Sequence, residues 1–168
     1  MLKRALVYGL PALALFVCIW VTRVFLAVDI VSLFMPMAGL PAIAAVAVVG
    51  GLLPSVPLGI AYGLIGPRPI VSTAFTVAVI ACLLELAFAS LTVPWWSFVT
   101  WWVLPVECVI VLAMFPAAAW IGSHLFARSD AIVRRRTGVG VFVLLPLGAI
   151  AWPWLHGCIR SGACGIGA

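Results

Sequence analysis

Two glutamates, Glu85 and Glu107, stand inside long apolar stretches of this chain, where a carboxylate is costly to place. Glu85 lies near the end of the apolar run 70–91, and Glu107 lies near the start of the run 100–126. A short turn joins the two runs, so we expect antiparallel helices that carry both carboxylates at the same depth. Two carboxylates in a low dielectric cannot easily both be ionised. Such a pair could relay protons, bind a cation or face a positive group of a ligand.

Arg23 and Asp29 fall at the same predicted membrane boundary and complete a candidate ion or ligand site with the two glutamates. Three interpretations are open. In a structural one, Arg23 pairs with one acid and the other acid is protonated and hydrogen-bonded. In the second the acids bind an ion or ligand, and in the third they reach the lipid surface. The helical face around Glu85 is small and weakly polar, which favours close helix contact; it consists of Ala74, Ala78, Cys82, Glu85, Ala89 and Thr92.

Cys158 and Cys164 lie close together in a Gly-rich tail, and a bond between them would close a small loop. If the tail lies outside the cytoplasm, where disulfides persist, a structural disulfide is the first interpretation and two free thiols are the alternative. The spacing differs from the C-x-x-C arrangement that tunes thiols for redox chemistry. With His156, the cysteines offer three ligands, whereas structural zinc takes four at recognisable spacing. We therefore expect no metal and no cofactor.

The elements that must position these residues are membrane helices. The chain is 67% hydrophobic and 8% charged, with a mean hydropathy of +1.35. In water this composition would expose large apolar patches, whereas helices in lipid satisfy their own backbone groups. We expect one all-α domain over 1–168, a polytopic five-helix transmembrane bundle. The predicted spans are 5–22, 41–65, 70–91, 100–126 and 139–155, with a short interfacial helix at 24–38 and an outer Gly- and Cys-containing tail at 156–168.

The basic residues predict the orientation of the bundle. With five spans and a cytoplasmic N-terminus, Arg23 and Arg160 lie outside and the other seven lie inside, as the positive-inside rule requires. The seven are Lys3, Arg4, Arg68, Arg128, Arg134, Arg135 and Arg136. We expect a bacterial-type inner membrane with the C-terminus outside. The three consecutive arginines in the hydrophilic segment 127–138 could attract anionic lipid head groups, or simply anchor the topology.

Small residues and prolines predict how the helices pack. Gly59 and Gly63 form a G-x-x-x-G pair, and Ala113 with Ala117 forms a second pair of small residues four apart. Such pairs let helices approach closely, and within one polytopic chain we expect internal packing rather than dimerisation. Pro54 and Pro57 predict a kink in the second span.

No zinc-protease helix, phosphate-binding loop, nucleophile elbow or dinucleotide fingerprint is present. The net charge of +5 does not indicate nucleic acid, because the basic residues flank apolar runs. We expect membrane lipid and other membrane-protein subunits as partners. The first hypothesis is a small non-enzymatic integral membrane protein, a subunit or accessory factor of a larger assembly. The alternatives are a small transporter or channel component that uses Glu85 and Glu107 as a proton or cation site, and a membrane enzyme acting on lipid or quinone through Arg23, Asp29, Glu85, Glu107 and His156.

Overall fold

The computed structural model describes residues 5–34, 40–92 and 98–161, with side chains for 7–23, 44–92 and 101–152. In this part of the chain the protein is all-α. A π-helical turn, Ala5–Gly9, leads directly into the first of five long helices. These are α2 (Leu10–Phe34), α3 (Leu40–Ile65), α4 (Ile70–Thr92), α5 (Phe98–Leu125) and α6 (Ala131–Ser161).

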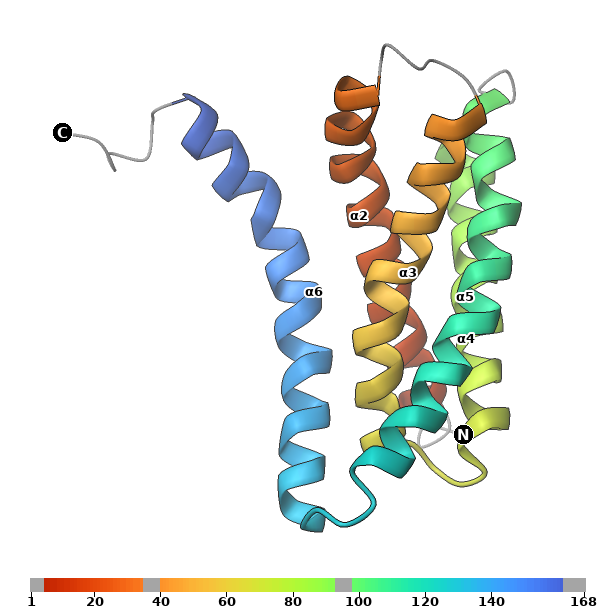
Figure 1. The fold of residues 1–168 in the computed structure, drawn as a ribbon, viewed down its shortest axis with the longest axis vertical. Coiled ribbons are helices and arrows are strands. Elements are labelled where there is room, and N and C mark those ends of the chain that lie inside the picture. Colours follow the sequence, from red (N-terminus) through yellow and green to blue (C-terminus); the bar gives the residue numbers. More distant parts are fainter. Residues whose placement is uncertain (1–4, 35–39, 93–97, 162–168) are drawn as a thin grey trace, which may run out of the picture.

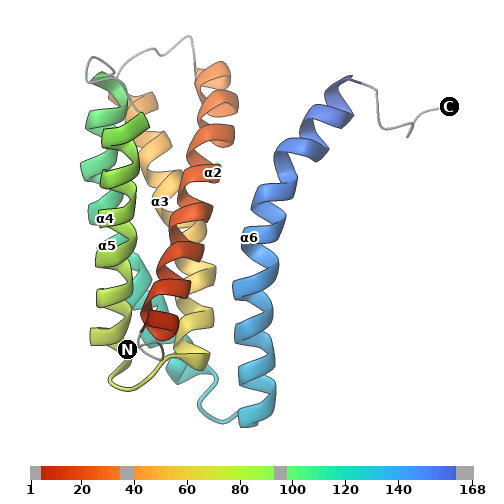
Figure 2. The same cartoon turned by 180° about the vertical axis from the view of Figure 1, so that it is seen from behind.

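Helices α2 to α5 form an up-and-down bundle, and α6 lies at one side of it (Figure 1). The most extensive packing is between α3 and α5, and α2 packs on both α3 and α4. Helix α6 contacts α2 and α3. The view from behind (Figure 2) shows that the end of α6 nearest the C-terminus leans away from the bundle.

Three helical segments of the described residues are long and apolar enough to cross a membrane: Ala44–Ile65, Ile70–Thr92 and Trp101–Leu125. They correspond to the second, third and fourth predicted spans and suggest a membrane location. A further apolar stretch, Val7–Arg23, is shorter. The crossing of the first and fifth predicted spans therefore stays a prediction.

Helix α2 does not end where the sequence analysis expected. A first span ending at residue 22 and a separate interfacial helix at 24–38 were predicted, but one helix continues through Arg23 to Phe34. The physical reason is that no glycine or proline follows until Pro36, so nothing in the backbone chemistry interrupts the helix. Arg23 was interpreted as the marker of a span end, and it lies instead within a continuous helix.

Helix α6 is also longer than expected at both ends. The prediction placed a span at 139–155 between a hydrophilic segment and a Gly-rich tail, whereas the helix begins at Ala131 and ends at Ser161. Arginine is a good helix former, so the charges that marked a loop in the sequence are compatible with the first turns of α6.

Gly59 and Gly63 bring α3 into direct contact with α5. A Cβ at Gly59 would lie 2.7 Å from both the Cβ of Ala118 and the carbonyl oxygen of Phe115. A Cβ at Gly63 would overlap the carbonyl oxygen of Ala119. The prediction that this G-x-x-x-G pair serves internal packing is confirmed.

The second predicted pair does not pack in the interior. Ala113 and Ala117 are both exposed on the surface of the bundle. The small residues of α5 that meet α3 are Ala118, Ala119 and Gly122, and a Cβ at Gly122 would overlap the backbone of α3. The spacing of four residues is typical of a packed helix, but Ala113 and Ala117 lie on a face of α5 other than the one that contacts α3.

Candidate functional site

Arg23 of α2 lies between the carboxylates of Glu85 on α4 and Glu107 on α5. Its Nη2 is 2.6 Å from Glu85 Oε1 and also contacts Glu107 Oε2. Its Nε donates a hydrogen bond to the same Glu107 oxygen at 2.9 Å. The side chains of Glu85 and Glu107 are 3% and 2% exposed, and that of Arg23 is 13% exposed. We name these three residues the buried charge triad.

The small face of α4 lets the helices approach closely enough to form the triad. Its predicted members are buried, except that Thr92 is exposed. Additional buried residues widen the face, so that it comprises Thr73, Ala74, Val77, Ala78, Ala81, Cys82, Glu85 and Ala89. Glu85 is therefore directed into the bundle by its neighbours, and exposure of this carboxylate to lipid is excluded.

Gly50 on α3 makes room for the second carboxylate. A Cβ built at Gly50 would lie 2.5 Å from Glu107 Oε1, closer than real side-chain contacts allow. A Cβ at Gly51 would lie 3.4 Å from the carbonyl oxygen of Glu107. Two adjacent glycines on α3 thus permit α5 to hold Glu107 against Arg23.

The charges of the triad do not cancel if both acids are ionised, because one guanidinium faces two carboxylates. Glu85 Oε2 and Glu107 Oε1 are buried without a hydrogen-bond partner among the described residues, and Glu85 Oε1 meets Arg23 without hydrogen-bond geometry. Burying an excess charge is strongly unfavourable. One proton on the pair of acids would make the triad neutral.

Two free thiols lie beside the triad. Cys82 is one turn before Glu85 on α4, and Cys108 follows Glu107 on α5; Cys82 Sγ is 3.9 Å from the Cys108 carbonyl oxygen. Neither thiol was among the site residues predicted from the sequence. The sequence feature that could have identified Cys82 is its position three residues before Glu85, which places both side chains on the same face of the helix.

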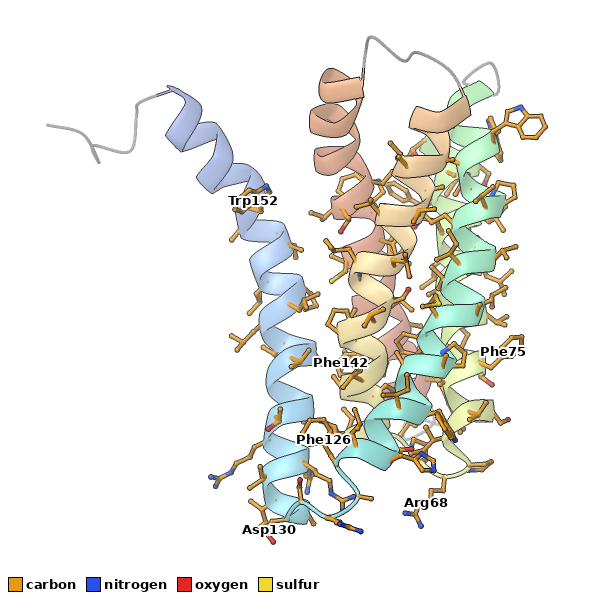
Figure 3. The ribbon with its side chains drawn as sticks, in the orientation of Figure 1. Arg68, Phe75, Phe126, Asp130, Phe142 and Trp152 are labelled. Carbon is orange, nitrogen blue, oxygen red and sulfur yellow. The ribbon has the colours of Figure 1, made fainter. Side chains whose placement is uncertain are left out.

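A cavity of about 610 Å³ lies between α2, α3 and α6, and no residue of the triad lines it. Thr22, which precedes Arg23, lines it from α2; Pro54 and Pro57 line it from α3; Gly148 and Trp152 line it from α6. Helix α3 runs unbroken through both prolines, although neither can donate a backbone hydrogen bond. Figure 3 shows Trp152 on the part of α6 that leaves the bundle.

Several predicted site residues lie outside the described side chains. Asp29 is six residues beyond Arg23 on α2, which places its backbone about 9 Å further along the helix axis. His156 and Cys158 belong to α6 by their backbone, and Cys164 lies outside the described residues altogether. The structure gives the Cys158–Cys164 disulfide no support, and it stays a prediction. Among the side chains that the structure describes, no group of three or more potential metal ligands occurs.

Comparison of the chain with protein-family models, with curated proteins and with solved structures gave no match.

Proposed function

We propose that the protein is a small non-enzymatic integral membrane protein that acts as a subunit or accessory factor of a larger membrane assembly. The observation that carries this proposal is the cavity of about 610 Å³ between α2, α3 and α6. It lies on the side of the bundle from which the C-terminal part of α6 diverges (Figures 1 and 2). Cys18 on one wall and Gly148 and Ala149 on the other are small. Small residues allow a further helix to approach closely in lipid, so this face suits contact with a transmembrane helix of a partner, a few side chains of which would enter the cavity.

In the proposed topology α2 to α6 each cross a bacterial-type inner membrane, with the N-terminus cytoplasmic and the C-terminus outside. The lengths of α2 and α6, 25 and 31 residues, support this because about 20 residues suffice to span the hydrocarbon core. The distribution of the basic residues outside the bundle also supports it, because seven lie on the cytoplasmic side and Arg160 lies on the outer side, whereas Arg23 is buried in the triad. A reporter fused after Ala168 is expected outside the cytoplasm, and a cytoplasmic reporter would contradict the topology.

The triad supports a structural use of the charged residues rather than catalysis. Arg23 contacts both acids, so the three side chains engage one another. In this role the triad fixes the relative positions of α2, α4 and α5. The enzyme alternative needs Asp29 and His156 at the same place, and their side chains lie outside the described part.

Filling the cavity is expected to release the partner. Gly148→Trp places a large side chain in the cavity, whereas Gly140→Trp makes the same change on α6 away from it, and a Cβ meets no atom within 4 Å at either glycine. Purification in native nanodiscs should yield one stoichiometric partner protein with the wild type and with Gly140→Trp. The Gly148→Trp protein should retain about tenfold less of it, as expected for a disrupted central contact.

A protein that purifies alone in all three forms would contradict the subunit proposal. A lipid found in the cavity by mass spectrometry, with no partner protein, would also contradict it and would assign the cavity to lipid.

A second candidate is a transporter or channel component that uses Glu85 and Glu107 as a proton or cation site. The imbalance of the triad favours it, because two buried carboxylates share one guanidinium. The missing positive charge must come from a proton or a bound cation. Flux through reconstituted protein that persists in the Glu85→Gln/Glu107→Gln double variant would exclude this use of the acids.

The two acids are expected to respond differently to neutralisation. Glu107 accepts the hydrogen bond from Arg23 Nε, whereas Glu85 makes only the ion contact. Glu85→Gln imitates a protonated acid and should change the melting temperature little. Glu107→Gln should lower the free energy of unfolding by about 1–3 kcal/mol, because a neutral amide oxygen accepts the Arg23 hydrogen bond more weakly than a carboxylate does.

Infrared spectroscopy provides the second measurement for this pair. The wild type is expected to show one protonated-carboxyl band at neutral pH, and Glu85→Gln should remove it. Equal destabilisation by the two variants, or a wild type without the band, would contradict this distribution of charge.

A further inference from the structure

A second pocket, of about 340 Å³, lies at the end of the bundle opposite the diverging end of α6. Arg68 from the turn between α3 and α4 lines it together with Arg134 and Arg135 from the first turns of α6. Figure 3 shows Arg68 at the same end of the molecule as Asp130, which directly precedes α6. Three guanidinium-bearing residues from segments far apart in sequence therefore border one small space.

No acidic side chain lines this pocket. Arg68, Arg134 and Arg135 make no side-chain hydrogen bond or ion pair with the described residues. The Nε of Arg134 is buried and has no hydrogen-bond partner there. A buried charged donor without an acceptor is unfavourable, so an anion bound in the pocket would stabilise Arg134.

The position of the arginines on α6 points to the same conclusion. Helix α6 begins at Ala131, and the amide N–H groups of its first turn carry partial positive charge. Cations are unfavourable at that end of a helix, whereas an anion is favoured by both the N–H groups and the arginines. Leu64, Ile65 and Val139 add apolar surface to the same pocket.

We propose that this pocket binds a phosphate group, and that its source is the head group of an anionic phospholipid. A guanidinium presents two parallel N–H donors that match the oxygens of a phosphate. The apolar wall beside the arginines suits the first carbons of the lipid chains. The inference shares the membrane location with the proposed function, but it does not require a partner subunit.

The experiment measures lipid binding to the purified full-length protein in detergent by native mass spectrometry. The probes are phosphatidylglycerol, phosphatidylcholine and inorganic phosphate. The wild type should bind phosphatidylglycerol about tenfold more tightly than phosphatidylcholine. Arg134→Gln and Arg68→Gln should each weaken phosphatidylglycerol binding about tenfold.

Arg136→Gln and Arg128→Gln are the matched controls. They remove the same charge from the same end of the chain, but neither residue lines the pocket. Their effect on binding should stay below about twofold, because a diffuse surface charge contributes less than a paired one. The melting temperature without lipid identifies any variant that misfolds, and Arg135→Gln replaces it.

Equal losses in Arg134→Gln and Arg136→Gln would overturn the pocket and leave general charge attraction. Equal binding of the two lipids would overturn it as well. Displacement of phosphatidylglycerol by inorganic phosphate supports recognition of the phosphate group itself, whereas binding of the lipid without such displacement supports the head group as the specific ligand.

Discussion

Arg23→Met should lower the free energy of unfolding by about 3–5 kcal/mol, the loss expected when one partner of a buried ion pair is removed. The guanidinium is the described group that contacts both Glu85 and Glu107, which are otherwise without hydrogen-bond partners. Without it, two acids would be left buried and unpaired. The measurement is reversible unfolding in mixed detergent micelles, with the exposed Arg128→Met as control.

The triple variant Arg23→Met/Glu85→Gln/Glu107→Gln separates the pairing from the packing. It removes every charge of the triad and should recover most of the loss, because a neutral group of similar size often replaces a buried ion pair at little cost. A single variant as stable as the wild type, or a triple variant no more stable than the single one, would show that the triad does not hold the bundle together.

Gly63→Ala should be nearly as damaging, at about 3 kcal/mol, because a Cβ there overlaps the Ala119 carbonyl oxygen and lies 2.8 Å from the backbone nitrogen of Ser123. Backbone atoms cannot rotate away as a side chain can, so α3 and α5 would have to separate. Gly140→Ala is the control, since no atom lies within 4 Å of its Cβ position. It should be neutral or stabilising by up to about 1 kcal/mol.

Thermal unfolding in detergent compares the two glycine variants directly. Similar melting temperatures for Gly63→Ala and Gly140→Ala would mean that α3 and α5 are not held at the distance that the structure shows. A disulfide engineered between the helices would then be needed to establish their spacing.

The proximity of Glu85 and Glu107 could be predicted from the sequence because a carboxylate within an apolar membrane helix faces the interior of the bundle rather than the lipid. A short turn between their helices fixed the common depth. The role of Arg23 was harder to predict, since hydropathy scales score arginine as strongly hydrophilic and so place it at the membrane–water boundary. Its partner Glu107 is 84 residues away, and they meet only because α2 and α5 both pack against α3 and α4.

The cavity and the contact face of α5 could not be derived from the sequence for a different reason. Small residues occur on more than one face of α5, so spacing alone did not distinguish Ala117 from Ala118 and Ala119. The cavity depends on the tilt of α6, which is set by side-chain packing rather than by the length of an apolar run. Pro54 and Pro57, which line the cavity, were recognised only as the source of a kink in α3, and that kink stays a prediction.

The sequence separation within the triad has a consequence for biogenesis. Arg23 is synthesised 84 residues before Glu107, which at about 5–20 residues per second corresponds to roughly 4–17 s of translation. If α2 enters the bilayer as it emerges, its cation has no counter-ion until Glu85 follows 62 residues later, and it lacks the second one until Glu107 is made. The nascent chain then has to be held at the insertion machinery, or the arginine has to wait near the head groups, until the later helices arrive.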